Sequence, residues 1–172
     1  MDGRAELIAV VRGAPNEEIQ ALFGTLAELW RPQLRLAGVV AESHELPDRF
    51  CQAGFLRNLP DGARYSIFHD LGPGAAACHL DGTGADAAAQ AVQRDIAAGC
   101  DLVLLSRFGK LEAAGNGLAG AFRAALRVRL PLLTSVSPAH DSAWREFAGR
   151  EFVVLPPDRA AIDRWRRKLQ LS

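Results

Sequence analysis

Charged and polar side chains follow directly after one of the most apolar runs of the chain. Ser106, Arg107, Lys110 and Glu112 come after the leucines and valine at 102–105. Such a run is typical of a buried parallel strand, and open α/β sheets bind ligands at the carboxyl ends of their strands. Arg107 and Lys110 can bind an anion, while Glu112 can orient one of them or accept a proton. An anion site is one interpretation, and a solvated loop is the alternative.

A second candidate position is the turn after the expected first strand at 7–11. Gly13 and Asn16 lie there, where nucleotide-binding α/β folds carry a phosphate-binding loop, and they offer backbone and amide donors. The turn has one glycine and no Lys-Ser or Lys-Thr pair. Glu17 and Glu18 would also repel a triphosphate. An ordinary helix start is therefore the alternative interpretation.

The thiols and imidazoles form a third set of candidates. Cys51, Cys78 and the neighbouring His79 have the sulfur and nitrogen atoms that transition metals prefer. None of the compact C-x-x-C or H-x-x-x-H spacings of metal sites occurs. A metal site at these residues is one interpretation, and ordinary buried thiols are the other. The 3 cysteines, an odd number at wide spacings, favour reduced thiols and a cytoplasmic protein.

Two adjacent pairs, His69-Asp70 and His140-Asp141, have residue types that occur in catalytic triads. The chain has no G-x-S-x-G nucleophile elbow, so we interpret both pairs as turn and helix-cap residues. Basic side chains also gather at 164–168, on an expected terminal helix. That pattern is typical of a solvated helix face, and we expect no nucleic-acid binding.

Size and charge limit the function classes. The chain has 172 residues, of which 49% are hydrophobic, and we expect a single domain over residues 1–172. Its 20 basic and 20 acidic side chains cancel, so no overall field attracts nucleic acid or an anionic membrane. No apolar run approaches the roughly 20 residues of a membrane span. The first apolar run reads as a strand and not as the core of a signal peptide. We expect no membrane partner.

Strand and helix patterns alternate along the chain and position these candidates. Strand-like runs lie at 7–11, 36–41, 102–105, 131–135 and 152–155, and helical patterns lie at 19–30, 85–98, 118–128, 142–147 and from 158 onward. This order predicts an α/β fold with three layers, in which helices cover both faces of a mostly parallel sheet. Turn residues Pro60-Asp61-Gly62 within 54–68 predict a β-hairpin inserted after the second strand.

The order of these features resembles a known family. AGVVAES, then GFLRNLPDGARYSIF, then a strand leading into FGKLE, resembles the small P-loop nucleoside-triphosphatases. DLGPGAAACHLD and SRFGKLEAAGNGL are similar to segments of a bacterial family of unknown function related to those enzymes, some members of which occur beside molybdate-transport functions. The resemblance covers almost the whole chain and implies a P-loop NTPase-like fold.

The resemblance also assigns expected roles. Gly109, Lys110 and Glu112 match the loop that follows the acidic strand of the nucleotidases, whereas Ser106 and Arg107 stand where those enzymes have an Asp-Glu pair. A nucleotide with magnesium is the cofactor that the family implies. Because the metal-binding acids and the phosphate lysine are both missing, the Walker motifs are degenerate and we expect no efficient hydrolysis.

We therefore expect a nucleotidase-like protein that binds a small anionic ligand, a nucleotide or an oxyanion, and that is not an efficient enzyme. The expected ligand-binding residues are Gly13, Asn16, Arg107, Gly109 and Lys110. One alternative is an active nucleoside triphosphatase that uses relocated acids, with Glu112 as the catalytic candidate beside Glu42 or Asp70. Another is a non-catalytic partner or regulatory protein linked to molybdenum metabolism. The sequence leaves the oligomeric state open.

Overall fold

Short apolar strands form a mixed sheet at the centre of the computed structural model, which describes residues 6–43, 53–67 and 82–169. Within these residues the sheet has seven strands in the order β4-β3-β2-β5-β6-β1-β7. They are β1 (Ile8–Val11), β2 (Leu36–Ser43), β3 (Ala53–Asn58), β4 (Arg64–Ser66), β5 (Leu102–Leu105), β6 (Leu132–Ser135) and β7 (Val153–Leu155). All neighbouring pairs are parallel except β2 with β3 and β3 with β4.

Helices connect the parallel strands. They are α1 (Asn16–Trp30), α2 (Gly82–Ala98), α3 (Lys110–Ala113), α4 (Ala119–Arg127), the 3-10 helix η1 (Pro138–His140), α5 (Asp141–Ala148) and α6 (Arg159–Lys168). Most lie where the sequence predicts a helix, with ends that differ by a few residues. The short α3 was expected to be loop, because four residues carry too little periodicity to predict a helix.

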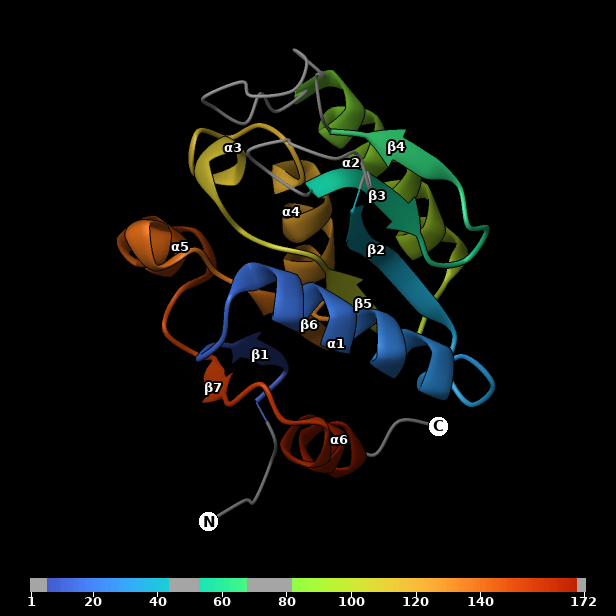
Figure 1. Ribbon diagram of the computed structural model, residues 1–172, viewed down its shortest axis with the longest axis vertical. Helices are drawn as coiled ribbons and strands as arrows, with labels where there is room; N and C mark the ends of the chain where they lie inside the picture. Colours follow the sequence, from blue (N-terminus) through green and yellow to red (C-terminus); the bar gives the residue numbers. More distant parts are fainter. Residues whose placement is uncertain (1–5, 44–52, 68–81, 170–172) are drawn as a thin grey trace.

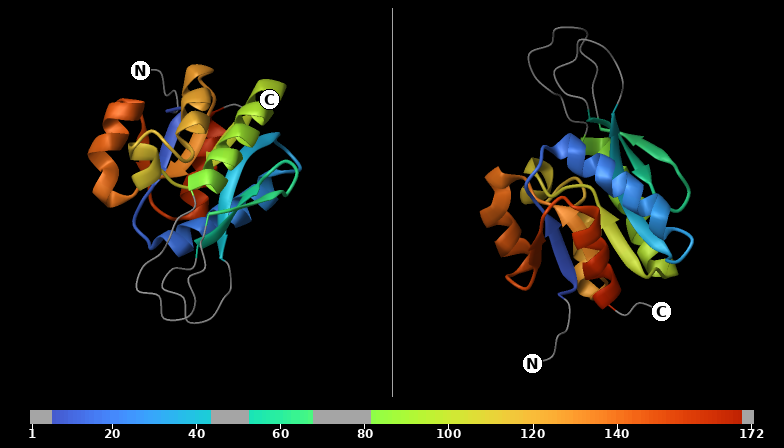
Figure 2. Two further views of the ribbon diagram at one scale, coloured as in Figure 1. Left: turned by 90° about the horizontal axis from the view of Figure 1, so that it is seen from above. Right: turned by 60° about the horizontal axis from the view of Figure 1, so that its bottom comes forward.

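The sheet is the middle of three layers. α1 and α6 pack on one of its faces, and α2, α4 and α5 pack on the other. Figure 1 shows α1 in front of the sheet, and the view from above in Figure 2 places α2 and α4 on the opposite side. The predicted fold class, a three-layer and mostly parallel α/β protein, is confirmed.

β5 shows why the central strands are continuously apolar. Leu102 and Leu104 point into the core beneath α1 and α6, whereas Val103 and Leu105 point into the core beneath α2 and α4. All four side chains are fully buried. Because successive side chains of a strand point to opposite faces, a strand covered on both faces must be apolar at every position. Ser106 and Arg107 follow directly where this apolar run ends.

The predicted β-hairpin is confirmed as β3 and β4, which extend the sheet beyond β2. Its turn contains Gly62 with φ +75°, a conformation that glycine adopts without a steric penalty. The Asn58 carbonyl accepts the Gly62 N–H, and the Asp61 carboxylate accepts the Ala63 N–H at 2.9 Å. The hairpin thus lies beside β2 and extends the sheet with antiparallel strands.

No helix in the described ranges is long and apolar enough to cross a membrane.

Candidate functional site

A cavity of about 250 Å³ lies at the carboxyl ends of the central strands. Its polar lining comes from α1, from the segment after β5 and from the segment after β6. The uncharged polar residues there are Asn16, Gln20, Ser106, Ser137 and His140. Open α/β sheets bind ligands at this edge, because strand ends and helix starts meet there without filling the space. The opening interpretation of the segment after β5 therefore points to the same place.

Most of the predicted ligand-binding residues share this cavity. Asn16, Arg107, Gly109 and Lys110 line it, and so does the catalytic candidate Glu112. Gly13 does not line it. A Cβ atom on Gly13 would lie 3.2 Å from Cδ of Pro157, so this glycine faces the connection from β7 to α6. Of the two donors predicted at the turn after β1, only Asn16 therefore lines the cavity.

Phe108 anchors the segment that carries Arg107. Its ring is fully buried and lies 5.2 Å from the ring of Trp144 and 5.5 Å from that of Phe122, measured between centroids. Its N–H donates to the Ser135 carbonyl and its carbonyl accepts the Ser137 N–H, which extends the pairing of β5 with β6. Arg107 is therefore fixed at a strand end and is not part of a solvated loop.

Glu112 is buried and satisfies two backbone donors. Its Oε1 accepts the Gly109 N–H at 2.9 Å, and its Oε2 accepts the Leu118 N–H at 2.8 Å. Burial raises the pKa of this carboxyl, and the two backbone hydrogen bonds and the charge of Arg107 lower it in part. Glu112 thus holds the loop between α3 and α4 in place, which is a structural task that occupies both of its oxygens.

Arg107 and Lys110 give the cavity positive charge. No described carboxylate lies within ion-pair distance of either side chain. Burial lowers the pKa of Arg107, and the nearby charge of Glu112 raises it in part. Arg107 is half-buried, whereas Lys110 is exposed at the start of α3. A guanidinium that has lost part of its hydration gains from an anion that restores its hydrogen bonds.

Gln20 joins the strand ends beneath the cavity, a role that sequence reasoning missed. Its Nε2 donates to the Ser106 carbonyl at 2.7 Å and to Asn16 Oδ1 at 3.2 Å, while its Oε1 accepts the Ala41 N–H at 3.1 Å. The Ser106 carbonyl also accepts the Ser135 hydroxyl at 3.0 Å. A signal was present, because Gln20 interrupts the apolar stripe of α1 next to Ile19.

The pair His140-Asp141 has different roles from the predicted ones. α5 begins at Asp141 without a side-chain cap, and the Asp141 carboxylate pairs instead with Arg12 and with Arg145. Asp141 therefore ties α5 to the turn after β1. His140 lines the cavity, and its buried Nδ1 has no hydrogen-bond partner among the residues that the structure describes. Sequence gave no reason to place His140 here, because only the fold brings η1 to this edge.

An apolar wall completes the cavity. It comes from the hairpin side of the sheet, from α2 and from the segment between β5 and α4. Its members are Ala41, Leu56, Ile67, Ala85, Leu111 and Leu118. All except Ala41 and Leu111 are buried, and these two are partly buried and pack against the same core. The cavity thus combines charged and apolar surface.

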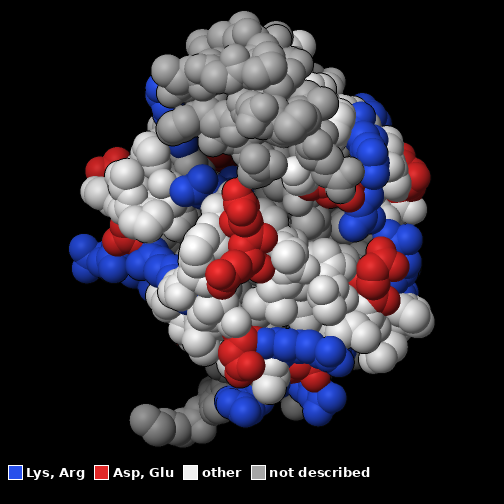
Figure 3. Space-filling view, viewed as in Figure 1, with Lys and Arg blue, Asp and Glu red and all other residues white. Residues whose placement is uncertain are grey.

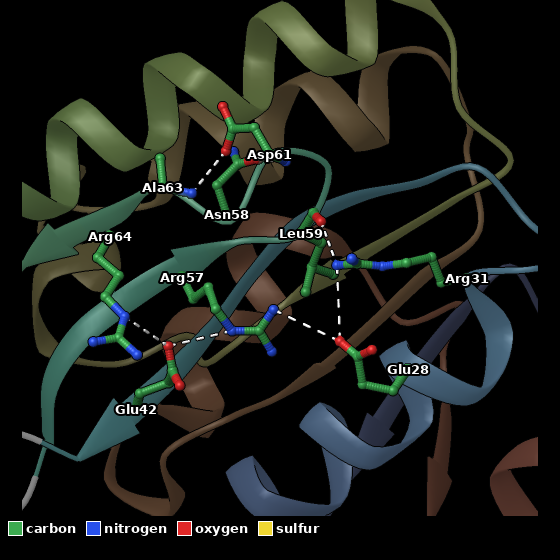
Figure 4. Close-up of polar contacts among 9 residues, drawn as sticks. All are labelled: Glu28, Arg31, Glu42, Arg57, Asn58, Leu59, Asp61, Ala63 and Arg64. Atoms are coloured by element: carbon green, nitrogen blue, oxygen red, sulfur yellow. Dashed lines mark hydrogen bonds and ion pairs between the residues drawn. The ribbon is translucent and has the colours of Figure 1, made fainter.

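Glu42, one of the relocated acids that hydrolysis would require, lies in an ion-pair network away from the cavity lining. Its Oε1 is 3.2 Å from Nε of Arg57 and 3.5 Å from Nε of Arg64. Arg57 also approaches Glu28 on α1, at 3.9 Å. Figure 4 shows this network across β2, the hairpin and α1. Glu42 thus links elements at the surface, and Asp70 lies outside the described residues.

The start of α1 carries negative charge at the surface. Glu17 and Glu18 are exposed in its first turn, and neither lines the cavity. Figure 3 shows acidic side chains gathered over this part of α1. These carboxylates favour the positive end of the helix dipole but oppose a polyphosphate at the turn after β1.

The described cavity residues offer few ligands for magnesium. Magnesium prefers several oxygen ligands, and Glu112 is the one carboxylate among the described cavity residues. Within the described ranges no group of three or more histidine, cysteine or acidic residues could hold a metal ion. The metal candidates Cys51, Cys78 and His79 lie outside those ranges. Cys100 lies partly buried before β5 as a free thiol.

The mostly parallel sheet and the helices on both of its faces define an α/β protein, and this architecture is consistent with a P-loop NTPase-like fold. Residues 8–165 match the family described as "Protein of unknown function (DUF2478)", and the chain belongs to it. The chain is also 33% identical over 162 residues, 93% of its length, to "Molybdenum import ATP-binding protein ModC 2" of Bradyrhizobium diazoefficiens. It spans 18% of the length of that protein. No solved structure matches the chain.

Proposed function

We propose that this protein binds a small anionic ligand in the cavity at the carboxyl ends of β5 and β6, and that it does not hydrolyse nucleoside triphosphates efficiently. One observation carries the proposal. Arg107 and Lys110 line the cavity, and no described carboxylate forms an ion pair with either. An anion in the cavity would accept charge-assisted hydrogen bonds from these two side chains. Asn16 adds an amide at the same cavity.

The positions of the acids support binding without hydrolysis. Efficient phosphoryl transfer requires a metal ion held by acids and a phosphate loop with a lysine. Glu112 already accepts two backbone N–H groups, and Glu42 is paired with Arg57 and Arg64. Gly13 lies apart from the cavity, beside Pro157. These positions favour a binding site that takes Asn16, but not Gly13, from the segment at the phosphate-loop position.

Isothermal titration calorimetry tests the proposal with inorganic phosphate, molybdate, AMP and ATP. Molybdate belongs to the panel because the relative's name refers to molybdenum import. We expect at least one of these anions to bind. Arg107→Ala should weaken the binding of that anion roughly 10- to 100-fold, since a charge-assisted hydrogen bond contributes about 1.5–3 kcal/mol to the binding free energy. Lys110→Ala should weaken it less, because Lys110 is exposed and more strongly solvated.

Arg94→Ala is the matched control, because Arg94 is an exposed arginine on α2 that does not line the cavity. The affinity of this variant for the anion should equal that of the wild type. Absence of binding by all four anions would refute the proposal, and so would binding that is equally strong in Arg107→Ala. ATP turnover with Mg²⁺ that exceeds the uncatalysed rate and disappears in Glu112→Gln would instead favour the nucleoside-triphosphatase alternative.

A further inference from the structure

We infer that the ligand of this cavity is an organic anion, in which a phosphate or similar oxyanion is bonded to an apolar group. The inference rests on the proposed function and names the class of ligand for the same site. It starts from the apolar wall opposite the charged residues. A free inorganic oxyanion would contact Arg107 and Lys110 but would leave that wall without a partner.

The order of strands separates the two parts of the cavity. Polar lining residues follow β5 and β6 or lie at the start of α1, which follows β1. Most of the apolar residues belong to β2, to the hairpin and to α2, on the other side of β5. Figure 1 shows the hairpin and α2 on the side of the sheet away from β1 and β6. A ligand that fills the cavity therefore meets charge at one end and apolar surface at the other.

Burial makes the apolar part a site for an apolar group. Leu56, Ala85 and Leu118 are 2–3% exposed, and water there would find few hydrogen-bond partners. An apolar ligand group would remove its own surface from water, together with the small part of this wall that is still exposed. Ligand sites combine apolar walls with a few oriented polar groups in the same way.

The volume agrees with a ligand of this class. The cavity holds about 250 Å³, whereas one water molecule needs only about 10–15 Å³ of such space. An oxyanion of a few atoms would fill a small part of it. Pockets for drug-sized molecules range from about 300 to 1,000 Å³. A phosphate bonded to one ring or to a short aliphatic group is larger than a free oxyanion and smaller than a drug-sized molecule, so its size suits this cavity.

Phenyl phosphate, methyl phosphate and inorganic phosphate provide the test, since they share the anionic group and differ in apolar surface. In calorimetric titrations of the whole chain, phenyl phosphate should bind at least about tenfold more tightly than the other two, because a buried ring removes much apolar area from water. Leu111→Gln places a polar group in the apolar wall at a partly buried position. It should lower the affinity for phenyl phosphate by a larger factor than the affinity for inorganic phosphate, and so reduce the preference.

Leu22→Gln is the control, because Leu22 is a partly buried leucine on α1 that packs against the other core and does not line the cavity. This variant should keep the preference for phenyl phosphate. Equal affinity for the three anions would overturn the inference and leave the proposed function standing. Failure of every anion to bind, including AMP and ATP, would overturn both. A preference that Leu111→Gln and Leu22→Gln reduce equally would also overturn the inference, because the effect would then be general.

Discussion

The charge state of Glu112 affects the stability of the loop between α3 and α4, which lies beside the cavity. Its carboxylate is buried, and the pKa is raised above its ordinary value of 4.5 by the loss of hydration. Two backbone N–H groups and the charge of Arg107 compensate only in part. In the folded protein Glu112 therefore binds a proton more readily than in the unfolded chain, and this difference makes stability depend on pH.

The first prediction at this scale concerns Glu112→Gln. Because the folded state of the wild type binds more protons between pH 4.5 and the raised pKa, the contribution of Glu112 to the free energy of unfolding falls as pH rises through that window. Glutamine cannot titrate and has one side-chain oxygen for two N–H donors. At the low-pH end of this window the free energy of unfolding of the variant should therefore be about 1–3 kcal/mol below that of the wild type. Urea unfolding at a series of pH values should show this deficit shrinking as pH rises.

Glu17→Gln is the control for that measurement, since Glu17 is exposed in the first turn of α1. This variant removes an exposed carboxyl, so its free energy of unfolding should stay within about 0.5 kcal/mol of the wild-type value. A deficit in Glu112→Gln that stays constant with pH would contradict a raised pKa of Glu112 in the folded protein, and a deficit that grows with pH would indicate a lowered pKa.

At the scale of elements, the connection between α3 and α4 packs around the same carboxylate. Gly117 has φ +59° and donates its N–H to Asp86 of α2 at 2.9 Å. A Cβ atom on Gly117 would lie 2.2 Å from Glu112 Oε2 and 2.8 Å from Cβ of Leu111. Both the backbone conformation and the space therefore require glycine here. This single position joins α2, α3 and the cavity wall.

Gly117→Ala should consequently destabilise the protein by at least about 1–3 kcal/mol, through the left-handed conformation and the displacement of Glu112. Chemical denaturation measures the loss. Gly24→Ala is the matched control, because Gly24 lies within α1 with no atom near its added Cβ. It should stabilise the helix by about 0.5–1 kcal/mol. Equal effects of the two changes would contradict the packing described for the α3–α4 connection.

At the scale of the whole molecule, the sheet has a protected centre and two exposed edges. β5 and β6 have neighbours on both sides and lie between two layers of helices. β4 and β7 are the terminal strands in the described sheet, and their side chains are partly or fully exposed. The cavity lies at the ends of the protected strands. The backbone of β5 and β6 beside the cavity should therefore be among the most rigid parts of the molecule.

Hydrogen exchange measured by mass spectrometry tests that distribution. Amides of β5 and β6 should exchange about 100-fold or more slowly than those of β4 and β7, because the central strands open only in large unfolding events. Peptides from α1 should be intermediate, since one face of this helix is in water. Equally fast exchange in β5 and β7 would contradict the packing of the central sheet.

The sequence by itself determined the layers and the edge at which the cavity lies. Apolar runs such as 102–105 can be satisfied only between two helical layers, and Pro60-Asp61-Gly62 forces a reversal of the chain. Local patterns of this kind involve only a few neighbouring residues, so they can be recognised from the sequence without knowledge of the fold. Arg107 and Lys110 were found for the same reason, because they follow such a strand directly.

Only the tertiary structure decided which residues share the cavity. Gly13 and Asn16 are three positions apart, yet only Asn16 lines it, while His140 joins from a segment more than 100 residues away. The apolar wall and the hydrogen bonds of Glu112 were likewise unreadable in the sequence. The physical reason is that contacts across strands depend on the order in which β2, β5, β6 and β1 pair. No local pattern specifies that order, because it results from packing both faces of the sheet at once.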